Sequence, residues 1–343
     1  MVLNSFNVTI EDEDILGLEN VSFSDSLTNS AANIRVSGVN KDFPTYSLYN
    51  KKVKFYLNYG GKDTVPFFIG YIRDYSSSDD GKFNFQAGDA RTFLSGDWSE
   101  SISLTDAYNF DGHTLAQFLH SYIADNTNKN KTYIGLDMLQ DTDKPILLEK
   151  LRGVFSPLDI ITTHLDKIKN LDKTDDQNIF AYFLDMIPGR EVSHITLMKE
   201  KSIDLNPTMT FKDNDGINKI RVKQKPTPNV GLGILDDKVI KFKYGSDIDE
   251  ISKTYDVAGL KTPAEVNEYL IYQITKEQKL GKEITLEAFK GHYLPLGTII
   301  ALNSNDDNTN GNHRIVSKNI NISNSGCSLS FGLDNNSTEL SLF

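Results

Sequence analysis

Residues 53–58 read Val-Lys-Phe-Tyr-Leu-Asn, and residues 298–303 read Thr-Ile-Ile-Ala-Leu-Asn. Both runs are short and rich in β-branched, aromatic and other apolar residues, a pattern that predicts strands. Shifting the chain by 245 positions, from 53 to 298, superimposes the two runs and also places Gly81 on Gly326. A turn glycine therefore follows each predicted strand at the same distance, which suggests that one β unit occurs twice.

The strand after each glycine is one residue out of phase under this shift. Its apolar alternation is carried by Phe83 and Phe85 in the first unit and by Leu329 and Phe331 in the second. A one-residue slip moves side chains to the other face of a sheet, so true copies need a local shift. Two interpretations stay open: an internal duplication, or antiparallel barrels that reuse turns of similar length.

The surrounding sequence predicts an α+β protein that is mainly β. We expect two antiparallel β-barrel domains, related by this repeat, with an inserted α/β domain. The expected boundaries are 1–100 for the first barrel, 101–200 for the inserted α/β domain, 201–226 for the first strands of the second barrel, 227–282 for a second insertion containing a helix at 262–281, and 283–343 for the rest of the second barrel and a C-terminal tail.

Three helix starts are indicated by capping residues. Thr114 with Gln117 and Thr262 with Glu265 have the spacing of a capping box. Ser156 can cap a helix in which Pro157 takes the first turn, and Asp159 suits the positive helix end. Apolar residues at three-and-four spacing follow the Thr114 and Ser156 caps, so these two segments are predicted to be amphipathic helices.

Composition limits the function classes. The 343 residues are 38% hydrophobic and carry a formal net charge of -11, which disfavours a nucleic-acid clamp because such a clamp needs a basic stripe. Cys327 is the one cysteine, so the sequence allows no internal disulfide. We find no apolar run long enough to span a membrane and no secretory signal at the start, and we expect assembly in a cytoplasm.

No motif for catalysis, cofactor binding or metal binding is recognised. The six histidines do not form HExxH, and the Asp213–Gly216 segment lacks the first ligand of a calcium loop because that place falls on Phe211. Gly231 and Gly233 have no third glycine or following helix, so a dinucleotide site is not expected. We therefore predict no catalytic, cofactor-binding or metal-binding residues, and a protein that is not an enzyme.

Several segments resemble a known family. The C-terminal runs 286–300, 311–320 and 326–334 look like the closing barrel of phage baseplate hub proteins, a family that includes the late control protein D group. Residues 68–74 and 86–94 are similar to the first barrel of that family, and residues 114–123 resemble the helix that opens its middle domain.

The resemblance implies a homotrimeric tail hub, with paired barrels below the tail tube and around a DNA-exit channel. Six similar barrels in three chains would adapt a sixfold tube to a threefold tip or spike. The implied partners are the tube protein, the spike or tip protein and other baseplate proteins. DNA would pass transiently without specific binding, in a virion assembled in the host cytoplasm.

We expect the two repeated strands to lie at edges and form the ring. The predicted ring residues are Val53, Phe55, Leu57, Thr298, Ile300 and Leu302.

Two alternatives remain. A distal tail adaptor would form hexamers with one barrel per subunit, and the second predicted barrel argues against it. A carbohydrate-binding or carbohydrate-cleaving tail protein could use tyrosines that lie close together in sequence. These are Tyr46, Tyr49, Tyr56, Tyr59, Tyr71 and Tyr75.

Overall fold

Strands dominate the computed structural model. It describes residues 5–26, 31–43, 47–58, 65–94, 113–114, 116–120, 134–136, 156, 158–161, 182–188, 193–199, 207–224, 226–245, 250–280, 282–305 and 309–334. Strands far outnumber helices among the described residues, which confirms the mainly β prediction.

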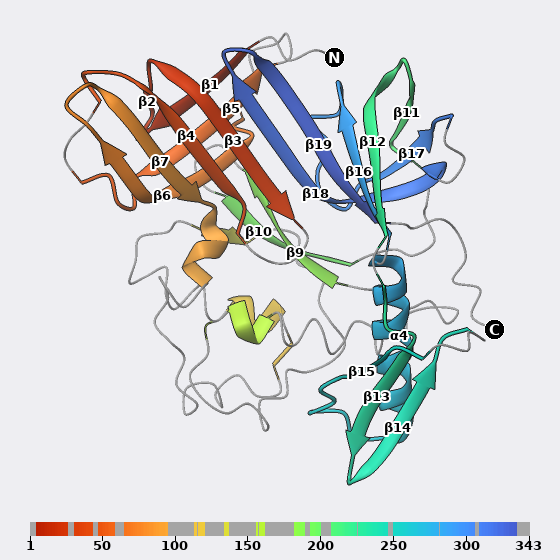
Figure 1. Ribbon diagram of the computed structural model, residues 1–343. Helices are drawn as coiled ribbons and strands as arrows, with labels where there is room; N and C mark the ends of the chain where they lie inside the picture. The colour runs from red at the N-terminus through yellow and green to blue at the C-terminus, as the bar shows by residue number, and fades with distance from the viewer. Residues whose placement is uncertain are drawn as a thin grey trace.

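One 13-stranded sheet contains most of these strands (Figure 1). Its N-terminal group is β1 (Ser5–Ile10), β2 (Glu13–Asp14), β3 (Leu18–Ser26), β4 (Asn33–Val39), β5 (Lys52–Asn58), β6 (Phe68–Ser77) and β7 (Lys82–Gly88), followed by the short 3-10 helix η1 (Ala90–Leu94). Its C-terminal group is β11 (Met209–Asp213), β12 (Gly216–Gln224), β16 (Lys282–Ala288), β17 (Ile299–Asn303), β18 (Gly311–Ser323) and β19 (Gly326–Asp334).

The C-terminal group forms a closed barrel. Its strands follow the order β17-β11-β12-β16-β19-β18, and β17 also pairs with β18. The closing strand β11 runs parallel to β17 and to the start of β12, so this barrel is not wholly antiparallel as predicted. The N-terminal group is an open half of the sheet, because among the described residues β1 and β3 do not pair with each other.

The two groups repeat the same core topology. The order β3-β4-β7-β6-β5 matches β12-β16-β19-β18-β17 in both chain order and pairing, and every one of these pairs is antiparallel. The copies even share their bulges. One lies at Glu19 and Asn218, and another lies at Arg73 and Val316.

Aligning the bulges removes the phase mismatch seen in the sequence. In β7, Gln86 forms the first pair after the bulge, and Phe85 is the next residue along the ladder. Gly332 and Phe331 hold the same two positions in β19, so Phe85 and Phe331 are equivalent. The uniform shift of 245 positions also superimposes the wrong residues of β5 and β17. Phe55, not Leu57, takes the place of Leu302, because β5 and β17 are aligned by their pairing with β6 and β18.

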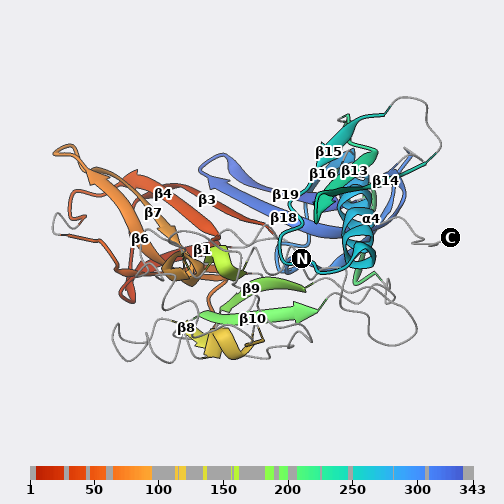
Figure 2. The same cartoon turned by 90° about the horizontal axis from the view of Figure 1, so that it is seen from below.

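Two smaller units are inserted into this frame. β8 (Ile134–Leu136), β9 (Tyr182–Pro188) and β10 (Ser193–Lys199) form a three-stranded sheet. A second sheet contains β13 (Val230–Leu235), β14 (Lys238–Lys243) and β15 (Ser252–Thr254), and it packs on helix α4 (Pro263–Leu280). Figure 1 shows the α4 unit projecting from the closed barrel, and in the view from below in Figure 2 the unit lies in front of that barrel.

Helix α4 confirms the helix predicted at 262–281. The capping box is present, since the Thr262 N–H donates to the Glu265 carboxylate and the Glu265 N–H donates to Thr262 Oγ1, both at 3.2 Å. Gly233 on β13 lets the helix approach closely, because a Cβ there would lie 3.0 Å from Val266 Cγ1. The glycine pair of the sequence therefore serves packing.

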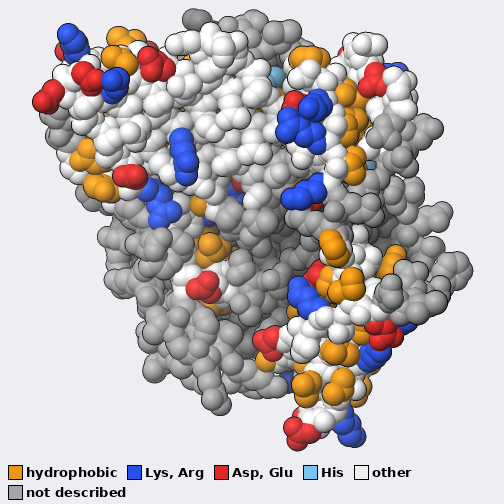
Figure 3. Space-filling view, viewed as in Figure 1, with side chains coloured by type: hydrophobic (Ala, Val, Ile, Leu, Met, Phe, Trp, Pro, Cys, Tyr) orange, Lys and Arg blue, Asp and Glu red, His pale blue; other side chains and the backbone are white. Residues whose placement is uncertain are grey.

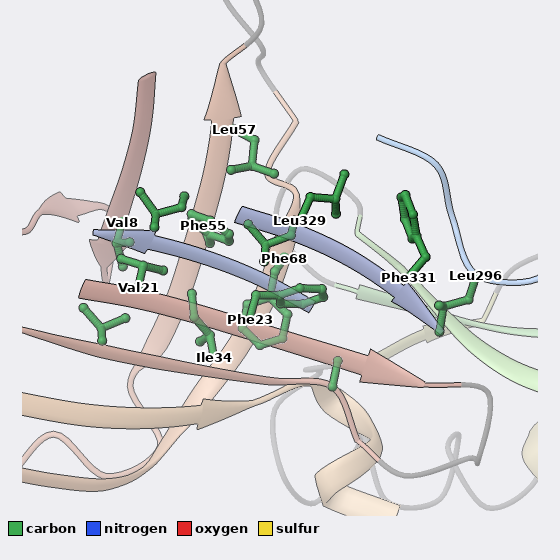
Figure 4. Packing of buried hydrophobic residues seen from close by; sticks show 14 of the residues in the cluster. Val8, Val21, Phe23, Ile34, Phe55, Leu57, Phe68, Leu296, Leu329 and Phe331 are labelled. Carbon is green, nitrogen blue, oxygen red and sulfur yellow. The ribbon is translucent and has the colours of Figure 1, made fainter. Parts of the chain in front are cut away.

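A single hydrophobic cluster fills both strand groups (Figure 4). Phe55 and Phe85 from the first group and Phe211 and Phe331 from the second are at most 2% exposed. Phe211 and Phe331 meet edge to face with their ring centroids 6.1 Å apart. The two groups therefore contribute to one hydrophobic cluster, and the predicted domain boundaries stay a prediction.

Candidate functional site: a polar face across two barrels

The two groups are joined by the pairing of β3 with β18. Residues from Asn20 to Ser26 pair antiparallel with residues from Ser323 to Ser317. Eight strands consequently lie side by side in the order β12-β16-β19-β18-β3-β4-β7-β6. The second half of this row repeats the first half, so the molecule presents one continuous surface built from two copies of one unit.

One side of this row faces the core, and the other forms a polar face. Directly paired residues share a face, which fixes the membership of this surface from the strand registers. The polar face includes Asn20, Ser22, Ser24, Asn33, Arg35, Ser37, Asp74, Ser76, Asn84, Gln86, Lys219, Arg221, Lys223, Glu283, Thr285, Glu287, Asn319, Asn321, Ser323, Ser328 and Ser330.

The centre of the polar face is uncharged. Where β3, β18 and β19 lie side by side between Asn20 and Ser24, the members are serine and asparagine, and Ser22 donates a 2.7 Å hydrogen bond to Asn321 across the junction. Figure 3 shows this region as an expanse of side chains that are neither hydrophobic nor charged. Short hydroxyl and amide side chains offer no cations for phosphate groups, so the centre of this face is not basic. The cations Lys219, Arg221 and Lys223 lie on β12, at one end of the row of strands.

Lys318 connects the two groups from the core side. Its Nζ is buried, donates to the carbonyl oxygens of His292 at 3.1 Å and Leu294 at 2.7 Å, and lies 4.5 Å from the ring centroid of Phe67. Phe67 belongs to the first group and packs edge to face on Phe23 of β3. The two carbonyl dipoles and the face of the Phe67 ring therefore stabilise the buried ammonium group at the junction of the two strand groups.

A buried ion network holds the end of β3. Arg91 on η1 donates to Asp89 Oδ2 at 2.7 Å and to Asp25 Oδ1 at 2.8 Å. Asp89 also accepts from the N–H of Ala32, which precedes β4. Because Asp25 pairs with Lys318 in the β3–β18 register, this network anchors the junction.

The predicted ring residues line the core instead of a free edge. Val53, Phe55 and Leu57 are at most 3% exposed, and so are Ile300 and Leu302. Figure 4 shows Phe55 and Leu57 directed into the hydrophobic cluster. Their strands are paired on both sides, β5 by β1 and β6, and β17 by β11 and β18.

Thr298 lies just before β17, and its carbonyl accepts from the Ile315 N–H at 2.9 Å. A ring contact at these positions stays a prediction. Of the six predicted ring residues, all but Thr298 have side chains buried in the core.

The residues proposed for other chemistry are dispersed. Tyr71 is buried. Tyr49 is 52% exposed and its ring packs edge to face on that of Tyr75, whereas Tyr46 and Tyr59 lie outside the described residues. The part of the chain that the structure describes contains no group of three metal-ligating side chains. It also contains no helix long and apolar enough to cross a membrane.

His292 gives a pH-dependent prediction for the junction. Burial, with a smaller contribution from the charge of Lys318, lowers the pKa of His292 to about 4. Its ordinary pKa is 6.5, so between pH 6.5 and 4 the unfolded chain binds a proton that the folded chain excludes. We expect the free energy of unfolding to fall by about 2 kcal/mol over this window as the pH is lowered.

Urea unfolding at pH 7 and pH 4.5 measures this change. His292→Gln should have a smaller loss between the two pH values than the unmodified chain, and the exposed His120→Gln should match the unmodified chain. Equal pH dependence in all three proteins would disprove the role of His292.

Several solved structures with a similar arrangement of strands are tail proteins. A tail protein from Neisseria meningitidis MC58 superposes with a TM-score of 0.70 at 11% identity, over 96% of this chain and 95% of that one. The 43 kDa tail protein of prophage MuSo2 from Shewanella oneidensis also gives 0.70 at 11% identity, over 96% and 98%.

The chain has the fold of phage tail proteins. A component of the type VI secretion system of E. coli, described as structurally similar to the T4 bacteriophage tail proteins gp27 and gp5, matches with a TM-score of 0.55 at 8% identity, over 97% of this chain and 78% of its own. No protein-family model and no curated protein sequence gives a match. The similarity of fold to tail proteins agrees with the resemblance to phage baseplate hub proteins seen in the sequence.

Sequence reasoning missed the polar face. The signal was present in the strands of this tail-protein fold, where serine or asparagine alternates with apolar residues. Ser22 and Ser24 flank Phe23, and Asn319 and Asn321 flank Ile320. Such alternation identifies a half-buried strand. What it could not show is that β3 and β18 are neighbours.

Proposed function

We propose that the protein is a structural component of a tail, a homotrimeric hub that adapts a sixfold tail tube to a threefold tip or spike. The observation that carries this proposal is the repeated strand group within one chain. Three chains provide six similar units around a threefold axis, which matches a sixfold neighbour on one side and a threefold neighbour on the other. The tail-protein fold supports the same role.

The polar face supports a channel function for this hub. If it lines the central opening, DNA meets serine and asparagine side chains at the middle of each chain. These groups carry no charge that would retain phosphates, and the cations Lys219, Arg221 and Lys223 lie at one end of the row, so we expect DNA to pass without specific binding. The partners of the hub are the tube protein, the spike or tip protein and other baseplate proteins, in a virion that is assembled in the host cytoplasm. Catalysis by this chain forms no part of the proposal.

Native mass spectrometry of the full chain, alone and with the neighbouring tube and spike proteins, tests the stoichiometry. We expect a species of three chains of 38.5 kDa each. Six copies bound to the tube would instead indicate a distal tail adaptor. Monomers in every mixture would overturn the hub proposal.

A further inference from the structure

Among the described residues, the row of eight strands ends in two edges at which no further strand is paired. On β6, pairing with β5 stops at Tyr71, and no described strand pairs on that side with residues from Asp74 to Ser77. On β12, pairing with β11 stops at Ile217, and no described strand lies beyond Lys219 to Lys223. Exposed edges offer backbone groups to a further strand. In Figure 1, β6 lies at the far side of the first group and β12 belongs to the closed barrel.

The chain already contains a contact between edges of these two kinds. By the aligned bulges, the second half of β6 is equivalent to the second half of β18, and β12 is equivalent to β3. Inside the molecule, β18 pairs with β3. The free edges of β6 and β12 are therefore equivalent to the two edges that pair at the β3–β18 junction.

We infer that the β6 edge of one copy pairs antiparallel with the β12 edge of a second copy. The inference rests on the proposed trimeric function and specifies its contact. The register is carried over from the internal junction, where Asn319 lies opposite Ser24 and Ile320 lies opposite Phe23. The equivalent positions place Ser76 opposite Lys223.

Apolar exposure at the β12 edge supports this contact. Val222 occupies the position equivalent to Phe23 and lies on the core side of the sheet, opposite Ile284. Phe23 is 4% exposed beside β18, whereas Val222 is 44% exposed. A neighbouring strand would cover Val222 as β18 covers Phe23, and burial of apolar surface favours that arrangement.

The charges of the two edges are complementary. The end of β6 and its turn carry Asp74, Asp79 and Asp80, all exposed, and β12 carries Lys219, Arg221 and Lys223, all exposed. Two of these groups also have partners within the chain, since Asp80 pairs with Lys82 and Arg221 pairs with Glu287. The remaining charges steer an acidic edge toward a basic one and disfavour contact between like edges.

A contact between two different edges is directional. Each copy uses its β6 edge for one neighbour and its β12 edge for another, so repetition produces a ring when the rotation closes. The same contact between identical edges would stop at a dimer. The inferred pairing thus predicts a closed ring of chains without a second interface type.

Disulfide trapping tests the register. We combine Ser76→Cys with Lys223→Cys in a Cys327→Ser background and oxidise the full chain mildly. Directly opposite residues on adjacent strands lie within the Cα distance that a disulfide spans. We expect covalent dimers and trimers, on the order of tenfold more than from the control pair Ser77→Cys with Lys223→Cys, because its side chains face opposite sides of the sheet.

Charge reversal provides a second measurement. Lys219→Glu with Lys223→Glu should weaken trimer formation about tenfold, and adding Asp74→Lys with Asp80→Lys in the same chain should restore it. Circular dichroism of the monomers checks that each variant folds.

The outcomes separate the two proposals. A trimer that is insensitive to charge reversal and does not form the Ser76–Lys223 cross-link overturns the inferred contact and leaves the hub proposal intact. Cross-linking by Ser76→Cys alone, which indicates contact between identical edges, also overturns it. Absence of both trimer and cross-link overturns the contact and the hub together.

Discussion

Replacing Arg91 by Met is expected to lower the free energy of unfolding by about 3–5 kcal/mol, because it removes the cation beside the buried Asp89 and the partly buried Asp25. Arg91 is fully buried, and Asp89 is 2% exposed. The guanidinium donates to Asp89 Oδ2 through Nε at 2.9 Å and through Nη2 at 2.7 Å, and to Asp25 through Nη2. Methionine fills a similar volume but neutralises neither carboxylate.

Urea unfolding measured by circular dichroism gives the loss. Arg35→Met is the matched control, since Arg35 lies on the exposed polar face and should change stability by less than about 0.5 kcal/mol. Combining Arg91→Met with Asp89→Asn should recover part of the loss by removing one unpaired charge. A loss for Arg91→Met no larger than that of Arg35→Met would contradict the network.

The same variant should loosen the junction of the two groups. Asp25 is held by Arg91 and pairs with Lys318 in the β3–β18 ladder. We expect faster hydrogen exchange of amides near Asp25, beyond the change that a uniform loss of stability produces.

Local signals in the sequence predicted local structure well. The Thr114 and Gln117 cap has both hydrogen bonds, Thr114 N–H to Gln117 Oε1 at 2.9 Å and Gln117 N–H to Thr114 Oγ1 at 3.3 Å. Ser156 and Asp159 form the same reciprocal pair. Such caps are predictable because the side chain and the backbone group that it satisfies lie three residues apart.

Long-range features were beyond the sequence for a physical reason. Ser22 and Asn321 bond across the junction although 299 positions separate them, and neither residue type identifies its partner strand. The bulges at Arg73 and Val316 shift the register by one residue, which a uniform alignment cannot represent. Alternation showed that Val53, Phe55 and Leu57 share a face, but the choice between core and interface depends on the neighbouring strands.

A shared core makes a further prediction about cooperativity. Phe331→Ala in the closed barrel is expected to cost about 3–5 kcal/mol, since it removes a fully buried aromatic ring that contacts Phe211. Phe85→Ala at the equivalent position of the open group should cost a similar amount. Phe289→Ala is the matched control, because this side chain is 62% exposed and should cost less than about 0.5 kcal/mol.

Hydrogen exchange measured strand by strand shows whether the two groups unfold together. One cluster contains both Phe85 and Phe331, and the β3–β18 ladder ties the groups along their edges. Phe331→Ala should therefore reduce protection in β4 and β7 as well as in β16, with a single urea transition. Loss confined to β16 and β19 would mean that the groups unfold as independent domains. The two strand groups would then be separate folding units, and contacts between chains, not the core within one chain, would have to hold them rigidly in a hub.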